Sequence, residues 1–376
     1  MPVLGSPRAS KAARRLKSYF AHEIGQRSGL AAKAKEFAGL GGASGSSGRA
    51  TPIFFVVGVP KSGTTWLMRT LDSHAEVLCK GEGRFFDREM ERGRLKRMQT
   101  SEHIKYKIQP SSLYHAIADD EYLRLWIERS VWTRDGDPEE QLKRLTRTAV
   151  NHFLTEKLAE TKKRMVGDKT PLSNTTIMRE ISEIYPDARV IHVIRDGRDT
   201  AVSRAHHNWN RATDKGGTKR FTSEELGKRD RYRENPEEFL ASGESIFTEK
   251  LIRKSAEIWE SRTRAAHRDG PALLGDNYTE VRYEDLLESP KGEFGRLFRF
   301  LGARTDEQIV SRCVEATSFE KRSGGRERGR EDAGSGIRKG VAGDWKNVLN
   351  ERDREIFKEE AGDLLVELGY ERNNDW

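Results

Sequence analysis

Residues 52–67 read PIFFVVGVPKSGTTWL, and this stretch decides the fold. Its first part, 53–57, is a short run of aromatic and β-branched residues, which is typical of a strand buried on both faces of a sheet. A loop of small residues from Gly58 to Gly63 follows, and Trp66 stands at the start of an expected helix. A strand, a glycine-bounded loop and a helix N-terminus form a cradle for phosphate, because free backbone N–H groups and the positive end of the helix dipole meet there.

The spacing of Gly58 and Gly63 matches the beginning of the nucleotide-binding pattern G-x-x-x-x-G-K-[ST], but the following residue does not match. Thr64 stands where the pattern has its lysine, and the lysine lies inside the loop at Lys61. Kinases and NTPases use that lysine on the β- and γ-phosphates and a hydroxyl on Mg²⁺. The displaced charge predicts a nucleotide whose single 5′-phosphate carries a different transferable group. A tight turn in an unrelated α/β domain is the alternative.

The composition favours a protein that handles anionic ligands. The 376 residues include 68 basic and 60 acidic side chains, a net charge of +8. Nucleic acid is compatible with this charge, but the sequence has no zinc-finger spacing, RNP-type aromatic pattern or heptads after a basic region, so we expect no nucleic-acid partner. Cys79 and Cys313 are too few for a disulfide framework, and we expect them to be reduced packing residues. We expect no metal site.

Residues 1–50 are expected to form a basic N-terminal arm that ends in a Gly/Ser linker, and residues 51–376 to form one domain. The linker reads GGASGSSG at 41–48, which is the composition of flexible chain. The basic residues near the start precede no apolar h-region, and no run approaches the ~20 apolar residues of a membrane span. We therefore expect a soluble cytoplasmic protein. These patterns indicate no particular oligomeric state.

The rest of the domain alternates short apolar strands with helices. This alternation predicts an α/β fold of three layers, with a central, mainly parallel sheet flanked by helices. Residues 90–165 read mainly as helices, and 210–247 read as a polar stretch without sustained periodicity, either a functional lid or a partly disordered segment. We assign both stretches, 90–165 and 210–247, to helical insertions on the acceptor side of the site. The other expected strands are 77–80, 165–168, 188–194 and 279–283, and the clearest helices are 139–162, 248–268, 290–301 and 351–368.

Apolar spacing also predicts core residues on the helical side of the domain. The expected helix 139–162 has a stripe of seven residues at helical spacing. His192 lies inside the expected strand 188–194, and we expect it to be a core histidine. We also expect Trp126, Trp132 and His115 to be core residues. The stripe consists of Leu142, Leu145, Ala149, Val150, Phe153, Leu154 and Leu158.

Two further segments carry side chains suited to anions. In 195–203, RDGRDTAVS, Arg195 follows a strand and Ser203 lies on the next helix, so a guanidinium fork and a hydroxyl can grip one phosphate. A Gly- and Arg-rich loop, 321–336, runs into Arg338 and Lys339, and its glycines allow close backbone approach to a ligand. Composition alone favours a solvated basic loop there. The pairing with the two other anion-type segments favours a binding loop instead.

Candidate general bases lie at the ends of strands. Glu82 follows the expected strand 77–80, at the position where open α/β sheets bind ligands. A loop or capping carboxylate is the alternative, because a base needs geometry as well as position. Lys169 follows the strand 165–168, where a lysine can handle charge. The remaining candidate bases are His115, His206 and His207.

Three segments together resemble the sulfotransferases that use 3′-phosphoadenosine 5′-phosphosulfate. They are PKSGTTW at 60–66, RDGRDTAVS at 195–203 and RKGVAGDWKN at 338–347, and their order and wide separation match as well. The resemblance covers residues 52 to 350 approximately. It implies a P-loop-like fold, the phosphosulfate as co-substrate, no metal requirement, and transfer of a sulfuryl group to an acceptor hydroxyl or amine.

The resemblance also implies roles for individual residues. Lys61 would stabilise the leaving phosphate, and Trp66 would stack on the adenine, which Tyr283 would also contact. Arg195 and Ser203 would bind the 3′-phosphate, and the 338–340 segment would close over it. The implied donor-binding set is Lys61, Ser62, Gly63, Thr64, Thr65, Trp66, Arg195, Ser203, Tyr283, Arg338, Lys339 and Gly340.

The resemblance is divided between two branches of the family. The segment RKGVAGDWKN at 338–347 looks like the cytosolic branch, and the acceptor side does not. The Lys-Thr pair of 169–171 precedes proline, so the histidine that serves cytosolic sulfotransferases of phenols and steroids is missing. The stretch 82–87, EGRFFD, resembles heparan-type enzymes, which implies Glu82 as general base and Lys169 as a charge-stabilising residue. The acceptor stays open among small molecules, glycans, peptide tyrosines and lipids. A P-loop small-molecule kinase and a non-catalytic anion-binding module are the competing functions.

Overall fold

The computed structural model describes residues 51–87, 112–133, 135–214, 221–332 and 334–376. They lie in one compact unit, Thr51–Trp376. The expected N-terminal arm, 1–50, and residues 88–111 of the expected helical region lie outside the described residues.

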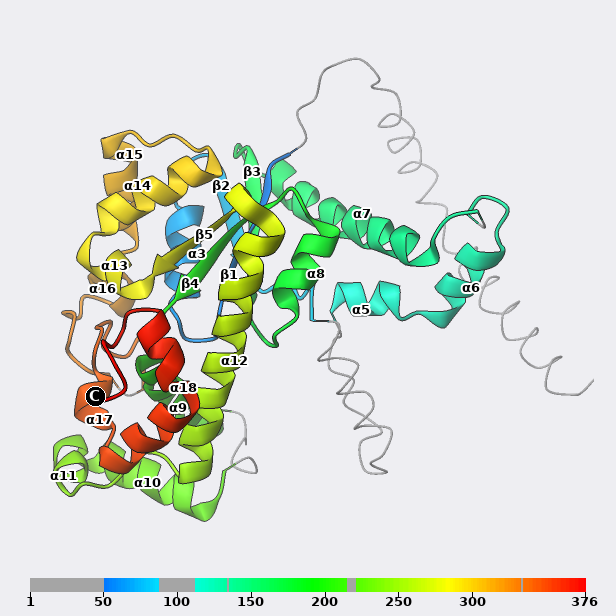
Figure 1. Ribbon diagram of the computed structural model, residues 1–376. Helices are drawn as coiled ribbons and strands as arrows, with labels where there is room; N and C mark the ends of the chain where they lie inside the picture. The colour runs from blue at the N-terminus through cyan, green and yellow to red at the C-terminus, as the bar shows by residue number, and fades with distance from the viewer. Residues whose placement is uncertain (1–50, 88–111, 134, 215–220, 333) are drawn as a thin grey trace, which may run out of the picture. The chain divides into compact units, whose positions relative to one another are not determined.

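The described sheet has five parallel strands in the order β2-β3-β1-β4-β5 (Figure 1). The apolar run that opened the sequence forms the central strand, between two strands that come more than 100 residues later. The expected parallel sheet is therefore confirmed, and β3 extends further than expected, so that it includes Lys169. The strands are β1 (Ile53–Gly58), β2 (Val77–Gly81), β3 (Met165–Pro171), β4 (Arg189–Ile194) and β5 (Tyr278–Arg282).

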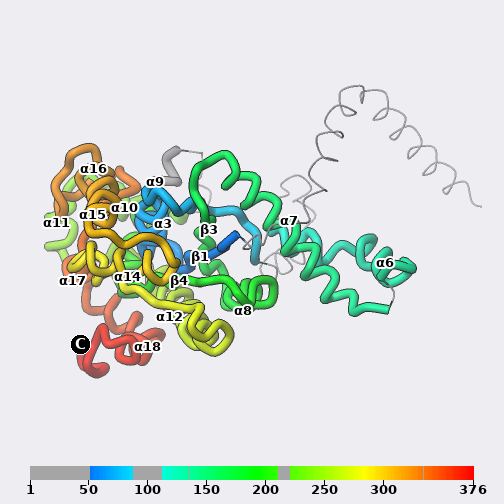
Figure 2. Tube along the Cα trace, turned by 90° about the horizontal axis from the view of Figure 1, so that it is seen from above, coloured from blue at the N-terminus to red at the C-terminus, as the bar shows by residue number. Residues whose placement is uncertain are grey.

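Helices cover both faces of the sheet, and alternate residues of β1 show the two cores. Phe55 and Val57 pack in the core with α8 (Ile177–Ile184), α9 (Gly197–Asp214), α12 (Glu249–Leu274) and α18 (Glu351–Glu367). Phe54 and Val56 pack in the core with α3 (Thr64–Asp72), α14 (Pro290–Leu301) and α15 (Glu307–Ala316). In Figure 2, α3 and α15 lie on the left of β1, and α8 lies on its right. The expected three-layer α/β fold is confirmed.

The remaining described helices connect these layers or extend from them. The expected helix 139–162 is observed as α7. The remaining described helices are α5 (Leu113–Ala118), α6 (Glu121–Arg129), α7 (Pro138–Ala159), α10 (Ser223–Glu234), α11 (Pro236–Ala241), η3 (Gly275–Asn277), α13 (Tyr283–Glu288), α16 (Phe319–Ser323) and α17 (Trp345–Val348).

Some side chains predicted to be core are exposed. On α7, Leu145 is 40% and Phe153 is 51% exposed, because the helix buries only a narrow stripe at i, i+4 spacing. Trp126 and Trp132 are 57% and 88% exposed, and Ile127 is the one buried residue of α6. Helical spacing alone cannot tell how wide a face the neighbouring elements cover. His192, Cys79 and Cys313 are buried as predicted, and both cysteines are free.

Most of the described part of the polar stretch 210–247 is helical, although its sequence shows no sustained periodicity. Residues 223–241 form α10 and α11, and Tyr232 is the buried residue of α10. A helix that buries a single side chain leaves no apolar stripe in the sequence. The sequence feature that marks this helix is its N-terminal cap, because Thr222 and Glu225 form a capping box at the start of α10.

Because all five strands are parallel, their carboxyl ends meet at one edge of the sheet. The loop with Lys61 leaves that edge after β1, and Arg195 leaves it after β4. Lys169 lies near the end of β3, and Glu82 follows β2. The fold thus brings Lys61, Glu82, Lys169 and Arg195 to the same edge.

Candidate active site

The loop between β1 and α3 forms a tight anion cradle. The Ser62 backbone N–H donates to the Val59 carbonyl at 3.0 Å, which turns the chain. Gly63 follows with φ +97°, and a Cβ there would overlap the ring of Tyr283, so only glycine fits. α3 begins at Thr64 without a side-chain cap. The first backbone N–H groups of the helix therefore remain as donors for an anion.

Lys61 is held in a strained conformation within this loop. Its φ of +84° lies in the left-handed region. This conformation destabilises a non-glycine residue by roughly 1 kcal/mol. Its carbonyl accepts a hydrogen bond from Arg195 at 3.2 Å. Burial, and then the positive charge of Arg195, lower the pKa of Lys61 to about 8. Backbone strain and a cation with a lowered pKa in one loop are typical of functional sites.

Arg195, in the segment 195–203, contacts the two other predicted segments. One Nη donates to the Lys61 carbonyl, and the other donates to the Val341 carbonyl at 3.1 Å. The guanidinium lies over the ring of Tyr283, 4.3 Å from its centre. The Arg195 carbonyl accepts a hydrogen bond from the indole N–H of Trp259 at 3.0 Å. These contacts fix the arginine between the loop after β1 and residues 338–347, which we call the C-terminal segment.

Asp199 on the first turn of α9 anchors the C-terminal segment. Its carboxylate accepts hydrogen bonds from the backbone N–H groups of Gly343, at 2.7 Å, and Trp345, at 2.9 Å. The Asp199 side chain is almost completely buried, and hydrogen bonds are electrostatically stronger in such surroundings than in water. The segments 195–203 and 338–347 therefore form one structural unit.

The C-terminal segment presents two cations beside a close ring contact. Lys339 Nζ donates to Asp344 at 2.9 Å, and Arg338 donates to the same carboxylate. Gly340 has φ +69°, and a Cβ there would overlap the ring of Phe319. Glycine at this position lets the backbone lie directly against that ring.

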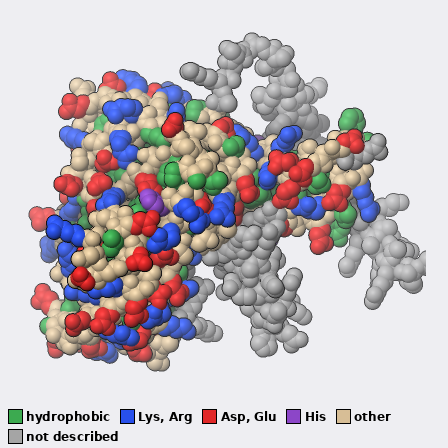
Figure 3. Space-filling view, in the orientation of Figure 1, with side chains coloured by type: hydrophobic (Ala, Val, Ile, Leu, Met, Phe, Trp, Pro, Cys, Tyr) green, Lys and Arg blue, Asp and Glu red, His purple; other side chains and the backbone are tan. Residues whose placement is uncertain are grey.

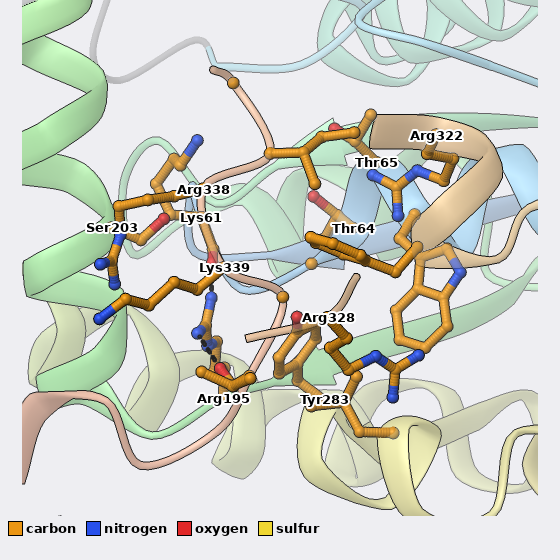
Figure 4. Close-up of a pocket in the computed structure, with 18 of the residues that line it drawn as sticks. Lys61, Thr64, Thr65, Arg195, Ser203, Tyr283, Arg322, Arg328, Arg338 and Lys339 are labelled. Atoms are coloured by element: carbon orange, nitrogen blue, oxygen red, sulfur yellow. Dashed lines mark hydrogen bonds between the residues drawn. The ribbon is translucent and has the colours of Figure 1, made fainter. Parts of the chain in front are cut away.

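These segments enclose a cavity of about 330 Å³. In Figure 4, the charged ends of Arg338 and Lys339 lie near Ser203 at one side of the cavity, and Arg322 lies at the other side. Ser62 does not line the cavity, because it is buried under the loop. The other predicted donor-binding residues all line it: Lys61, Gly63, Thr64, Thr65, Trp66, Arg195, Ser203, Tyr283, Arg338, Lys339 and Gly340.

The sequence interpretation missed several residues that line the cavity. Burial, followed by the charge of Arg69, lowers the pKa of Arg322. Arg322 and Arg328 lie in the Gly- and Arg-rich stretch 321–336, where no spacing distinguishes them from the other arginines. Phe319 begins α16 and shows no periodic signal. The missed lining residues are Arg69, Leu287, Phe319, Arg322, Arg328, Gly336, Ile337 and Val341.

Five buried polar atoms in or next to the cavity wall have no hydrogen-bond partner among the described residues. A buried donor without an acceptor costs about 1–3 kcal/mol, so such groups need a reason to persist. All five atoms can donate a hydrogen bond, which fits a ligand rich in acceptor oxygens and nitrogens. They are Ser62 Oγ, Trp66 Nε1, Arg195 Nε, Arg322 Nε and Arg338 Nη1.

Glu82 and Lys169 pair with each other and do not line this cavity. Lys169 Nζ donates to the Glu82 carboxylate. The loop after Glu82 is fixed by Gly83, whose backbone N–H donates to Asp168 at 2.9 Å. Burial raises the pKa of Asp168 to about 6. The structure therefore places the two residues next to each other, at the same sheet edge as the cradle.

The histidines considered as bases do not line the cavity either. His115 on α5 pairs with Asp119, with 2.7 Å between Nδ1 and Oδ2. Burial, and then the positive charge of Arg338, lower the pKa of His206 to about 3. A histidine with such a pKa is a weak base. His207 lies next to it on α9, half-buried.

Within the described part of the chain, no group of three or more His, Cys, Asp and Glu side chains is arranged to hold a metal ion. None of the helices described has the length and apolar character needed to cross a bilayer. On the face drawn in Figure 3, basic and acidic side chains of the described residues are interspersed. That face lacks the continuous basic stripe with which many proteins follow a nucleic-acid backbone.

Comparison with known proteins identifies similar sequences. The model of the family described as "Sulfotransferase domain" matches residues 51–368. Sulfotransferase 1C2 from Homo sapiens is 35% identical over 89 residues, which cover 20% of this chain and 30% of that protein. The protein-tyrosine sulfotransferase of Drosophila melanogaster is 24% identical over 158 residues, which cover 42% and 26%. The chain thus aligns with less than a third of the length of either relative.

Solved structures with a related arrangement include two sulfotransferases. Mouse sulfotransferase SULT7A1, complexed with PAP, is 17% identical with a TM-score of 0.42, and the match covers 86% of this chain and 90% of that one. Sulfotransferase STF9 from Mycobacterium avium is 11% identical with a TM-score of 0.44, and the match covers 85% and 77%.

Proposed function

Because this chain belongs to the sulfotransferase family, we propose that it transfers a sulfuryl group from 3′-phosphoadenosine 5′-phosphosulfate to an acceptor hydroxyl or amine. The observation that carries the proposal is the cavity in which Lys61, Arg195 and Arg338 meet, with Trp66 in its wall. Three cations and an aromatic surface suit a purine nucleotide with charged groups at both ends.

In this proposal the loop binds the 5′-phosphosulfate and the two other segments bind the 3′-phosphate. Lys61 and the N-terminus of α3 face the first group, with Ser62, Gly63, Thr64 and Thr65 forming the cradle. Arg195 and Ser203 bind the 3′-phosphate together with Arg338, Lys339 and Gly340. Trp66 and Tyr283 contact the adenine. The unpartnered donor atoms support this fit, since four of the five belong to residues of this set, namely Ser62, Trp66, Arg195 and Arg338. Side-chain cations offset the ligand's charge, and no metal ion takes part.

The chemistry is an in-line displacement at sulfur. A bond forms between sulfur and the acceptor atom while the bond between sulfur and the bridging phosphate oxygen breaks. Lys61 offsets the negative charge that develops on the departing phosphate. Glu82 takes the acceptor's proton as general base, and Lys169 orients that carboxylate and stabilises charge on the acceptor side.

The acceptor is a small molecule, a glycan or another hydroxyl-bearing compound, and no nucleic-acid partner is expected. Helices α5–α7 and the pair α10 and α11 shape the acceptor side in this proposal. One relative is named protein-tyrosine sulfotransferase, which makes a peptide tyrosine one acceptor to test. Glu82 suits such a role because more than half of its side chain is exposed.

Thermal unfolding with nucleotides tests the donor site. A ligand that binds only the folded protein raises Tm, by an amount that grows with its concentration relative to Kd. We expect adenosine 3′,5′-bisphosphate to raise Tm equally with and without EDTA, and ADP with Mg²⁺ to have little effect.

Two outcomes contradict the proposal. A rise in Tm with ADP and Mg²⁺ alone supports a P-loop kinase. An anion-binding module is supported if the protein binds the bisphosphate with an affinity that falls steeply as salt is added, and transfers no ³⁵S from the labelled donor. The acceptors tested for transfer are phenols, amino sugars and tyrosine peptides.

A further inference from the structure

Two carboxylates of the chain share the two cations at one end of the cavity. Lys339 Nζ lies 3.1 Å from Glu331 and 2.9 Å from Asp344. Arg338 lies 3.2 Å from Glu331 and also donates to Asp344. Arg338 and Lys339 both line the cavity, so their charges are divided between these carboxylates and any ligand there.

The two carboxylates are held differently. The Asp344 side chain is 3% exposed, and it accepts hydrogen bonds from both cations. The Glu331 side chain is 20% exposed and lies in the irregular loop between α16 and α17. Arg338 Nη1 lies 3.2 Å from Glu331 without hydrogen-bond geometry, and the described residues offer it no hydrogen-bond partner. Glu331 is therefore the more easily displaced of the two.

A second contact gives Glu331 an alternative partner. The hydroxyl of Tyr232 donates to its carboxylate at 3.2 Å. Tyr232 is buried on α10, so its hydroxyl is a fixed point beside the cations. Glu331 can keep this hydrogen bond when Arg338 and Lys339 turn to another anion.

We propose that Glu331 competes with the 3′-phosphate of the nucleotide for Arg338 and Lys339, and thereby sets how tightly that phosphate binds. This inference rests on the proposed function. A phosphate on these cations lies beside the Glu331 carboxylate, and two neighbouring anions repel each other. Asp344 keeps both cations oriented in either case. Glu331 thus acts as a specificity-determining residue that lowers the affinity for nucleotides with a 3′-phosphate.

The competition has a consequence for turnover. The product bisphosphate keeps the 3′-phosphate, so the same repulsion that weakens donor binding also speeds product release. Product release limits turnover in many enzymes. Removing the Glu331 charge is therefore expected to tighten binding of the product and slow its dissociation.

The test is the variant Glu331→Gln, with calorimetric titration of adenosine 3′,5′-bisphosphate and of adenosine 5′-monophosphate, which lacks the 3′-phosphate. We expect Kd for the bisphosphate to fall about tenfold, the effect of one charge a few ångströms away at an effective dielectric constant between those of protein and water. Kd for the monophosphate is expected to change by less than about twofold. Glu327→Gln is the matched control, because Glu327 lies exposed in the same loop, and it is expected to change neither Kd.

Two results overturn the inference. One is an unchanged or weaker affinity of Glu331→Gln for the bisphosphate, which would make Glu331 a support for the two cations. The other is an equal gain for both nucleotides, which would be a general effect of charge. If the wild-type protein binds neither nucleotide, the proposed function itself fails. Glu331→Asp retains the charge, and its affinity is expected to stay within about threefold of the wild type.

Discussion

Lys169 donates a hydrogen bond to the Glu82 carboxylate, and this ion pair joins the ends of the neighbouring strands β2 and β3. A Cβ on Gly81 would lie 2.8 Å from Lys169 Cε, so this glycine leaves room for the lysine side chain. The Lys169 side chain is 7% exposed and that of Glu82 is 56% exposed. The pair therefore buries its cation and presents its carboxylate.

Replacement of that carboxylate tests the general base. Glu82→Gln keeps the shape of the side chain but cannot take a proton, so we expect transfer of ³⁵S from labelled donor to an acceptor panel to fall by about 10²-fold or more. Binding of adenosine 3′,5′-bisphosphate, followed by calorimetry, is expected to be unchanged. Glu128→Gln, at an exposed position on α6, is the control. Turnover of Glu82→Gln within about threefold of the wild type would exclude Glu82 as the base.

The pKa of Lys61 predicts how nucleotide binding depends on pH. Burial and Arg195 lower this pKa to about 8, so the side chain is protonated below pH 8 and loses its charge above it. Only the protonated lysine attracts phosphate, and bound phosphate raises its pKa again. We expect the affinity for the bisphosphate to be flat just below pH 8 and to fall as pH rises from 8 to 10.

Lys61→Arg serves as the control for this pH dependence, since a guanidinium stays charged throughout the range. Calorimetry in buffers of different ionisation enthalpy is expected to show proton uptake by the wild type on binding above pH 8, and none by the variant. Parallel pH profiles for the two proteins would contradict the assignment.

A buried polar cluster predicts acid-sensitive stability. Burial alone would raise the pKa of Glu280, but hydrogen bonds from His192, Tyr278 and His267 outweigh it and lower the pKa to about 2. A carboxylate whose folded-state pKa is lowered stabilises the protein above its unfolded-state pKa, near 4.5, and this contribution disappears as pH falls toward 2.

Glu280→Gln is expected to lower the free energy of unfolding by about 2 kcal/mol at pH 7, which is a few degrees in Tm. The difference from the wild type should shrink below pH 4.5. Denaturant melts at several pH values measure it, with the exposed Glu288→Gln as control. A difference that is independent of pH would mean that packing, and not charge, explains the loss.

The close approach of Gly340 to Phe319 predicts a binding defect. Gly340→Ala adds a Cβ that overlaps the Phe319 ring at a backbone conformation with φ +69°. Because both residues line the cavity, we expect bisphosphate affinity to fall about tenfold or more, the equivalent of a strain of 1–2 kcal/mol. Gly334→Ala, in the same loop, meets only an ordinary contact and should bind normally. Equal affinity of the two variants would contradict the prediction.

The sequence reveals the fold because its strongest signals are local. The run at β1 and the glycine-bounded loop are contiguous, and parallel strands bring their carboxyl ends together whatever lies between them. Lys61 and Arg195, which follow β1 and β4, could therefore be assigned to one edge of the sheet without knowing the chain between them. Arg338 follows no strand, and the resemblance is what joins it to this site. Family resemblance supplied their roles, which geometry alone does not.

The parts of the fold and of the cavity lining that the sequence does not predict depend on tertiary contacts, which leave no local sequence pattern. Phe319 lines the cavity only because α16 packs there, and α10 buries one side chain, so neither shows periodicity. Trp132 shows the opposite error. Its aromatic side chain predicts a core position, but no neighbouring element covers it and the ring is exposed. The contact between Glu331 and Arg338 joins residues of a loop whose composition indicated only charge.

The strand order has a consequence for synthesis of the chain. Ile53 of β1 pairs with Val166 of β3, which is translated 113 residues later, and β4 follows it. At ~5–20 residues per second, the apolar segment that becomes the centre of the sheet waits roughly 6–23 s for its first neighbour on the ribosome. During that interval it is an uncovered strand, the kind of segment that chaperones bind and that aggregates when they do not. Yield of native protein should therefore depend more on chaperone supply and translation rate than on the stability of the finished fold.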